Sequence, residues 1–421
     1  MAGNDELLNF FSKPRTTAAP TIIDYESAPV RPPEEPLDVE NTDRRDSDET
    51  MSLDDMLKFM LKVGGSDLFL TVNSEPMVSV HDRMTPVEGF SKMSGKQIET
   101  TIYSILTGEQ RKSFEERKEL DASYAIPGLS RFRVNVFRSK GHAAAVLRAI
   151  PFEIKPISKL GLPISINDYA NLPRGLVLVT GPTGSGKSTT LAAIIDQINR
   201  TKSGHILTIE DPIEFIHGHK GCIVNQREIG VDTDSFENAL KAALREKPDY
   251  VLVGELRDLE TISLAVTIAE TGHLVFGTLH TQSSAETISR IVDVFPADQQ
   301  DQIRTQLAAT LQGVVCQNLV RTADGKGRVA AIEIMNITQS IKTKIIKNQL
   351  NAITSDLQLG KDHGMQTMDS HLVELAKSGR ITIEDALEKS HRRADMILDF
   401  GGEREVERLI ARQQGDNRLA F

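Results

Sequence analysis

Eight consecutive residues carry the clearest chemistry in this chain. The segment Gly181-Pro182-Thr183-Gly184-Ser185-Gly186-Lys187-Ser188 satisfies the pattern GxxxxGK[ST], and Thr189 follows it. The glycines let successive backbone N–H groups approach phosphate oxygens, and a helix that begins there adds partial positive charge. Lys187 can reach the β and γ phosphates, and the Ser188 hydroxyl can ligate Mg²⁺. The sequence therefore predicts a loop, residues 181–189, that binds ATP.

Carboxylates that hold the metal and orient a water are also needed for hydrolysis. Glu210, Asp211 and Glu214 follow one apolar segment, and Glu255 follows another. Because the carboxyl ends of parallel strands share one edge of a sheet, we expect these side chains to converge on Mg²⁺ and the attacking water. Glu255 stands where Asp is usual, so we expect it to reach Mg²⁺ through water. The alternative is that these carboxylates cap helices that begin after the strands.

Two histidines bracket one further apolar segment. His273 and His280 are seven residues apart, and an odd spacing places them on opposite faces of an ideal strand. We therefore expect them not to act as one pair. A single histidine at a strand end is more often a structural hydrogen-bonding group than a catalyst.

The elements that must position these residues alternate along the chain. Short apolar strands are predicted at 176–179, 205–209, 250–253 and 274–279, with helical stretches between them. This order is typical of a parallel sheet covered by helices on both faces, and we assign residues 175–340 to this core. Residues 341–400 are predicted to be mainly helical, and 401–421 to form a polar tail or loose helix.

The part before the core differs in composition. Residues 1–50 carry 5 basic and 12 acidic side chains with many prolines, which predicts a disordered tail. A helix beginning near Leu53 and strands at 67–72, 131–137 and 143–150 predict a small α+β domain over 51–151. Residues 152–174 contain two prolines and read as a linker.

Composition excludes several classes of protein. The two cysteines, Cys222 and Cys316, cannot build a tetracysteine zinc site or a disulfide scaffold. The net charge of −10 favours no nucleic-acid partner. No apolar run approaches the roughly 18 residues of a membrane span, so we expect a cytoplasmic chain without direct membrane insertion.

Taken together, four boxes resemble the secretion ATPase superfamily: the phosphate loop, an Asp box at 207–217, an atypical Walker B box ending at Glu255, and a His box at 272–281. Within the superfamily, the lack of a tetracysteine module is typical of the retraction branch, the PilT/PilU family. Three segments are most similar to PilU members of that branch: 64–70, 221–228 and 364–369. The carboxy-terminal signature of that branch is degraded here to Ser340–Ile346.

The resemblance implies a RecA-like P-loop core, a PAS-like amino-terminal domain and a helical carboxy-terminal region. It implies roles for Glu214 as general base, for Glu255 as the Walker B glutamate, and for His273 and His280 as the His box. It further implies that Arg133 and Arg148 approach the γ-phosphate and that Arg290 is an additional core arginine. The implied assembly is a homo-hexamer that uses ATP and Mg²⁺. Its implied partners are a paralogous retraction ATPase and a pilus platform protein at the inner membrane.

Three functions follow as hypotheses. The first is an ATP-hydrolysing motor for type IV pilus retraction and twitching motility. The second is an accessory subunit that couples another retraction ATPase while its own hydrolysis is dispensable, which the degraded signature favours. The third is a motor for pilus extension or protein secretion. The weak basic character argues against a DNA-translocating ATPase.

Overall fold

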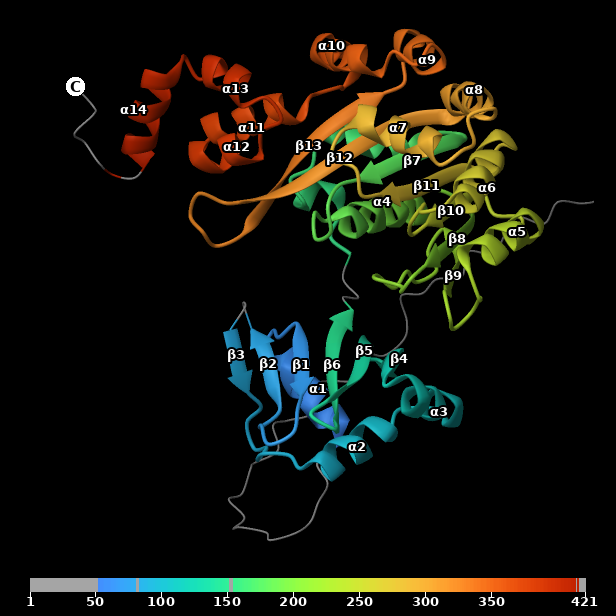
Figure 1. Cartoon of the computed structure of the whole chain (residues 1–421), viewed down its shortest axis with the longest axis vertical. Coiled ribbons are helices and arrows are strands. Elements are labelled where there is room, and N and C mark those ends of the chain that lie inside the picture. Colours follow the sequence, from blue (N-terminus) through green and yellow to red (C-terminus); the bar gives the residue numbers. More distant parts are fainter. Residues whose placement is uncertain (1–51, 81–82, 151–153, 414, 416–421) are drawn as a thin grey trace, which may run out of the picture. The chain divides into compact units, whose positions relative to one another are not determined.

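The computed structural model describes residues 52–80, 83–150, 154–413 and 415. The prediction for residues 1–50 lies outside these residues. The described chain contains a six-stranded and a seven-stranded sheet, followed by a helical region (Figure 1). None of the helices in the described ranges is long and apolar enough to cross a membrane.

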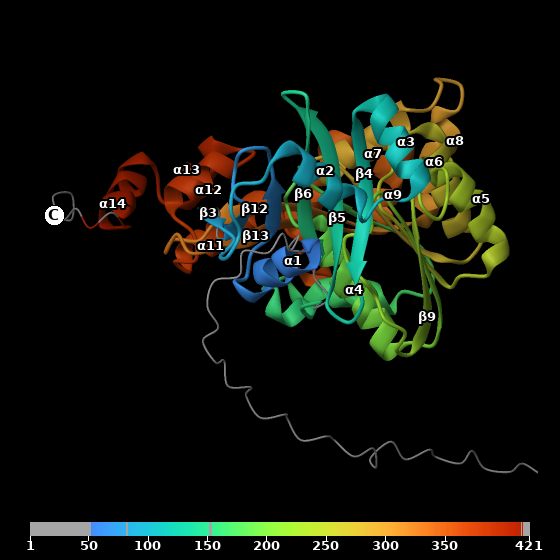
Figure 2. The ribbon, with the colours of Figure 1, turned by 90° about the horizontal axis from the view of Figure 1, so that it is seen from below.

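The six-stranded sheet is antiparallel, in the order β3-β2-β1-β6-β5-β4. Its strands are β1 Asp67–Leu70, β2 Met77–Val80, β3 Arg83–Pro86, β4 Glu119–Ile126, β5 Ser130–Ser139 and β6 His142–Ile150, and its helices are α1 Leu53–Lys62, α2 Gly95–Tyr103 and α3 Gly108–Arg117. Side chains alternate along β5, so Phe132, Val134 and Val136 are buried in one cluster with residues of all three helices. Figure 2 shows this sheet with α1, α2 and α3 labelled.

The seven-stranded sheet has the order β13-β12-β7-β11-β10-β8-β9. Its strands are β7 Gly175–Thr180, β8 Gly204–Glu210, β9 Cys222–Glu228, β10 Tyr250–Val253, β11 Leu274–Leu279, β12 Leu311–Arg321 and β13 Arg328–Asn336. All neighbouring pairs are parallel except the β12–β13 hairpin. The strands predicted at 176–179, 205–209, 250–253 and 274–279 are therefore present, whereas β9 and the hairpin lay outside the sequence prediction.

Helices cover both faces of this sheet. Leu176 and Leu178 of β7 face one cluster, which contains residues of α5 Phe236–Glu246, α6 Leu259–Glu270, α7 Ser284–Asp293, α8 Gln300–Thr310, α9 Gln339–Ile346 and α10 Ile353–Leu359. Val177 and Val179 face the other cluster, which contains α4 Lys187–Thr201 and two 3₁₀ segments, η1 Ile157–Lys159 and η2 Ile164–Asn171. Part of the segment expected as a linker therefore packs beneath α4.

The remaining helices follow β13. They are α11 Met368–Lys377, α12 Ile383–Lys389, α13 Arg393–Asp399 and α14 Glu403–Gln413. Val320 of β12 and Val329 and Ala331 of β13 join these helices in a separate buried cluster. The long hairpin thus attaches the helical region to the sheet that carries the phosphate loop.

Candidate active site

Four parallel strands end at the same edge of the seven-stranded sheet. The phosphate loop follows β7, the acidic segment from Glu210 follows β8, Glu255 follows β10 and His280 follows β11. Residues 183–189 of the loop line one cavity together with Glu210, Glu214, Glu255 and His280. Segments up to about a hundred residues apart in sequence therefore meet where the backbone of a parallel sheet leaves room for a ligand.

The loop leads directly into α4. Gly186 is the helix N-cap with φ +90°, a left-handed conformation that favours glycine. Lys187 is the first helical residue and is almost fully buried; its Nζ donates to the carbonyls of Gly181 (2.8 Å) and Pro182 (3.1 Å). Burial lowers the pKa of Lys187, while Glu255 and Glu214 oppose that shift. Two of the four carboxylates that the sequence assigned to this site, those of Glu255 and Glu214, therefore act electrostatically on Lys187.

One side chain of the loop has no partner within the described protein. Ser185 is buried, and its hydroxyl makes no hydrogen bond there. Ser185 lines the cavity, so a polar ligand at this position would satisfy it.

Glu255 is held from two sides. One carboxylate oxygen accepts a hydrogen bond from Arg257 at 2.6 Å, and the other lies 3.3 Å from Nε2 of His280. The Arg257 hydrogen bond is the largest cause of a lowered pKa of Glu255, with a smaller contribution from His280. The Glu255 carboxylate therefore stays negatively charged, as a group that holds a metal must be.

Glu210 differs from Glu214, although both belong to the Asp box. Glu210 is buried and accepts hydrogen bonds from Thr208 (2.7 Å), Gln226 (3.2 Å) and the backbone N–H of Glu214 (3.4 Å). Burial raises the pKa of Glu210 despite these bonds. Glu214 is exposed, and only its backbone is tied to Glu210. Glu210 therefore organises the segment, while the Glu214 carboxylate is available to the cavity.

The two predicted histidines lie at opposite ends of β11. His280 is at the carboxyl end beside Glu255, whereas the His273 ring contacts the Ile268 carbonyl (2.9 Å) and the Thr271 hydroxyl (3.1 Å) at the amino end. His273 is not among the cavity residues, and neither is Arg290, which is exposed on α7. The structure thus brings His280 to the other site residues and keeps His273 and Arg290 apart from them; the roles of the latter two stay predictions.

Arg133 and Arg148 form a cross-strand pair in the six-stranded sheet. They occupy directly opposed positions of β5 and β6, and both are exposed. Arg148 donates to Asp67 (2.6 Å), and Arg133 lies 3.9 Å from Asp121. Two like charges at opposed positions repel each other. An anion near both guanidinium groups would relieve that repulsion.

Sequence reasoning missed one residue beneath the phosphate loop. The amide of Gln317 on β12 donates to the Ser185 carbonyl and accepts from the Thr190 hydroxyl, both at 2.8 Å. A Cβ atom on Gly181 would lie only 2.1 Å from the Gln317 carbonyl oxygen. The strand and the loop are therefore in direct contact, and no motif in the sequence marks this glutamine.

Comparison with known proteins shows which family has this sequence and fold. The family model described as Type II/IV secretion system protein matches residues 53–420. This chain belongs to that family. The match spans both sheets and the carboxy-terminal helices, so the secretion-system family accounts for nearly all of the described structure.

Several relatives in this family are similar to the chain in sequence over most of its length. The chain is 50% identical to the type IV pilus retraction ATPase PilT of Pseudomonas aeruginosa, over 81% of this chain and 98% of that protein. It is 40% identical to the type IV pilus ATPase PilU of the same organism, over 87% and 96%. A crystal structure of the pilus retraction motor PilT with bound ADP superposes with a TM-score of 0.77 at 46% identity, over 81% of this chain and 97% of that one.

These relatives confirm two predictions from the sequence. The PilT/PilU family is the correct one, and identity is higher to PilT while the PilU match extends over more of this chain. The fold class is also confirmed: a RecA-like P-loop core with a small α+β domain before it and a helical region after it.

Proposed function

We propose that this chain is an ATP-hydrolysing motor that drives type IV pilus retraction and thereby twitching motility. A relative named as a type IV pilus retraction ATPase matches over 98% of its length, and one named as a type IV pilus ATPase matches over 96%. One observation carries the proposal: Lys187 and the carboxylates of Glu214 and Glu255, distant in sequence, line a single cavity. A phosphate cradle with two carboxylates beside it has the parts that phosphoryl transfer to water requires.

The phosphate loop binds the nucleotide in this mechanism. Backbone N–H groups of 183–188 and the amino terminus of α4 face the phosphates. Lys187 exchanges its contacts with the Gly181 and Pro182 carbonyls for phosphate oxygens. The exchange favours binding because the phosphate oxygens are negatively charged, whereas the two carbonyl oxygens are neutral.

The donors at this edge fit Mg²⁺: the Ser188 hydroxyl would bind it directly, and the Glu255 carboxylate would hold it through water. Within the described ranges there is no group of three or more His, Cys, Asp or Glu side chains that could hold a metal by itself. Mg²⁺ keeps several waters and binds through one or two protein groups together with substrate phosphates, so Ser188 and Glu255 would suffice. When bound, it would neutralise charge on the β and γ phosphates.

Glu214 orients the attacking water and takes its proton. Its carboxylate is exposed at the cavity, whereas Glu210 is committed to internal hydrogen bonds. Glu255 would hold Mg²⁺ through water, and His280 contacts the Glu255 carboxylate and keeps it in place.

A hexamer would turn this reaction into motion. Arg133 and Arg148 would sense the γ-phosphate, so that its loss changes the contact between the amino-terminal domain and the core. The ring would act on a platform protein at the inner membrane, with a paralogous ATPase as partner. These elements rest on the family resemblance.

Two variants test the catalytic assignment. Lys187→Ala should abolish ATP binding and turnover, and Glu214→Gln should bind ATP and fail to hydrolyse it. Lys202→Ala, at the other end of α4, and Glu237→Gln, on α5, are the matched controls and should retain wild-type turnover. Wild-type turnover in both site variants would refute the assignment.

An accessory role is the second candidate, because the retraction signature is degraded at Ser340–Ile346. This segment lies in α9, where Ser340 and Lys344 bind Asp356. Lys187→Ala should be expressed in a deletion strain with and without an active retraction ATPase. Retraction that persists only with the active ATPase would establish the accessory role.

The number of pili on a strain that lacks this protein separates retraction from extension. More pili indicate lost retraction, and no pili indicate lost extension.

A further inference from the structure

The segment that carries Glu214 has no regular secondary structure, yet it is fastened at many points. It runs from Asp211 to Gly221, between β8 and β9, without helix or strand. Glu214 itself is exposed. Something else must therefore fix the position of its backbone.

Gln226 on β9 holds the segment on both sides of Glu214. Its Nε2 donates to the Phe215 carbonyl (2.8 Å) and to the Glu210 carboxylate (3.2 Å), and its Oε1 accepts from the His217 N–H (2.8 Å). Glu210 in turn accepts the backbone N–H of Glu214 at 3.4 Å. One side-chain amide thus connects the residues before and after the proposed general base.

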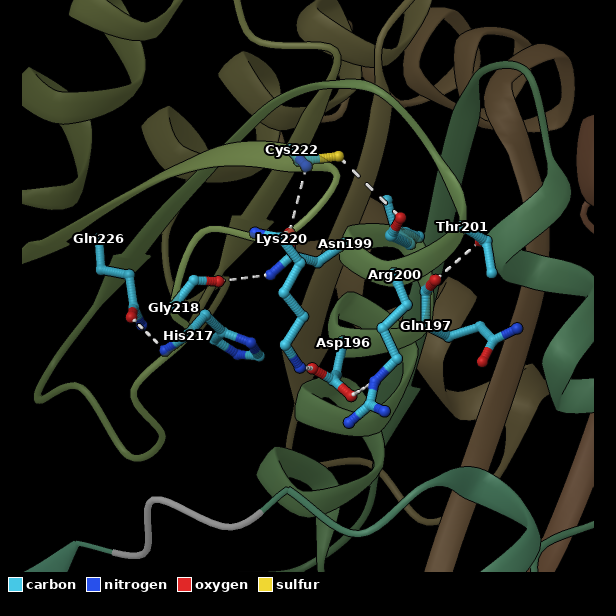
Figure 3. Close-up of polar contacts among 11 residues, drawn as sticks. Asp196, Gln197, Asn199, Arg200, Thr201, His217, Gly218, Lys220, Cys222 and Gln226 are labelled. Atoms are coloured by element: carbon cyan, nitrogen blue, oxygen red, sulfur yellow. Dashed lines mark hydrogen bonds and ion pairs between the residues drawn. The ribbon is translucent and has the colours of Figure 1, made fainter. Parts of the chain in front are cut away.

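Asn199 on α4 holds the remainder of the segment. It is fully buried; its Nδ2 donates to the Gly218 carbonyl (2.7 Å), and its Oδ1 accepts from the N–H groups of Lys220 (3.1 Å) and Cys222 (3.3 Å). Figure 3 shows Asn199 and Gln226 on either side of the turn through His217 and Gly218.

Close packing reinforces this attachment. A Cβ atom on Gly221 would lie 2.3 Å from the Lys202 carbonyl oxygen and 3.0 Å from that of Asn199. The buried Asp196 on α4 also forms ion pairs with Lys220 and Arg200. The segment is therefore fixed to the same helix whose amino terminus begins at Lys187.

We propose that Asn199 and Gln226, here called the amide clamp, are positioning residues that place Glu214 at the right distance from the phosphates bound at the start of α4. The proposal rests on the proposed function, in which Glu214 is the general base. Neither clamp residue lines the cavity, so they act through Glu214 and not on the nucleotide. Misplacement of a reacting group by about 1 Å can cost on the order of a hundredfold in rate.

The chemistry of an amide explains why both positions need one. Gln226 uses donors and an acceptor at once, and a carboxylate provides no donor. Gln226→Glu would place a negative charge beside Glu210 and the Phe215 carbonyl, which repels both. The side chain keeps its size, so the effect is confined to hydrogen bonding and charge.

The test uses the full-length protein with Gln226→Glu. The kcat for ATP should fall by about tenfold or more, while KM and the Kd for ADP stay within about twofold. Asn225→Asp makes the same amide-to-carboxylate change on the exposed neighbour and should leave kcat within about twofold. In a Glu214→Gln background, Gln226→Glu should reduce the residual rate by less than about twofold, because the two changes remove one function.

Each outcome decides the proposal. Wild-type kcat in Gln226→Glu, or equal loss of ADP binding and kcat, overturns the clamp. If Gln226→Glu does not fold, Asn199→Asp takes its place: it keeps the acceptor, loses the donor to Gly218, and must show the same fall in kcat at unchanged KM. Full hydrolysis in Glu214→Gln would instead refute the role of Glu214 as general base, on which the clamp rests. An inactive Glu214→Gln beside an active Gln226→Glu would refute the clamp alone.

Discussion

The imidazole of His280 lies 3.3 Å from the carboxylate of Glu255, across the ends of two neighbouring parallel strands. Arg257 donates to the other carboxylate oxygen at 2.6 Å. Because the Arg257 hydrogen bond is the main cause of the lowered pKa of Glu255, the carboxylate remains charged at a pH where an ordinary glutamate begins to take up a proton.

Arg257→Ala should therefore make the enzyme more sensitive to acid. Without the guanidinium the pKa of Glu255 rises, so less of the carboxylate is charged on the acidic side of the optimum. The acidic limb of kcat/KM, measured from about pH 5 to about pH 8, should shift to higher pH. Lys241→Ala, which removes an exposed cation on α5, is the control and should leave the profile unchanged. An unshifted limb in Arg257→Ala would show that Glu255 does not control it.

Gly181 and Gly184 should respond differently to the same substitution. Alanine at 181 would place Cβ 2.1 Å from the Gln317 carbonyl oxygen, so the loop or β12 must move. Alanine at 184 meets no atom within 4 Å, although its φ of +77° strains the backbone by roughly 1–2 kcal/mol. By titration calorimetry, Gly181→Ala should lose measurable ADP binding, and Gly184→Ala should weaken it by about tenfold. The reverse order would contradict the packing of the loop.

Gln317→Leu should weaken nucleotide binding without touching the nucleotide. The change leaves the Ser185 carbonyl and the Thr190 hydroxyl without their buried partner, and such a loss costs about 1–3 kcal/mol. The Kd for ADP should therefore increase by about tenfold or more. Asn318→Leu, the neighbouring position on β12, is the control. Equal affinities in both variants would mean that the loop keeps its shape without this support.

That the acidic residues converge on one cavity could be predicted from the sequence, whereas the residues that support this cavity could not. Glu214 and Glu255 follow apolar strands, and the shared edge of a parallel sheet brings such positions together. Gln317 contacts Ser185 across 132 positions in sequence, and that contact exists only because β12 pairs in parallel with β7. Nothing near Gln317 in the sequence indicates which strand will be its neighbour.

The contacts of the amide clamp and of the two arginines could not be predicted either, because they too depend on the assembled fold. The partners of Gln226 are mostly backbone groups, which carry no residue-type signal. Arg133 and Arg148 alternate on strands that the sequence predicts, but their opposed placement depends on the register of β5 and β6. Strand register is set by turns and by burial of a whole face, so it emerges only from the assembled sheet.

The buried His217 should make the folded protein less stable as the pH falls. Burial lowers the pKa of His217 to about 4, from about 6.5 when unfolded, with Lys220 lowering it further and Asp196 opposing. Between these values only the unfolded chain takes up the proton, so stability falls as pH decreases through this window and the loss is complete below about 4. At about pH 5 the loss is roughly 2 kcal/mol, so His217→Gln should show a smaller drop in Tm from pH 7 to 5 than the wild type. The exposed His142→Gln should keep the wild-type drop, and an undiminished drop in His217→Gln would mean that the buried ring is already protonated in the folded state.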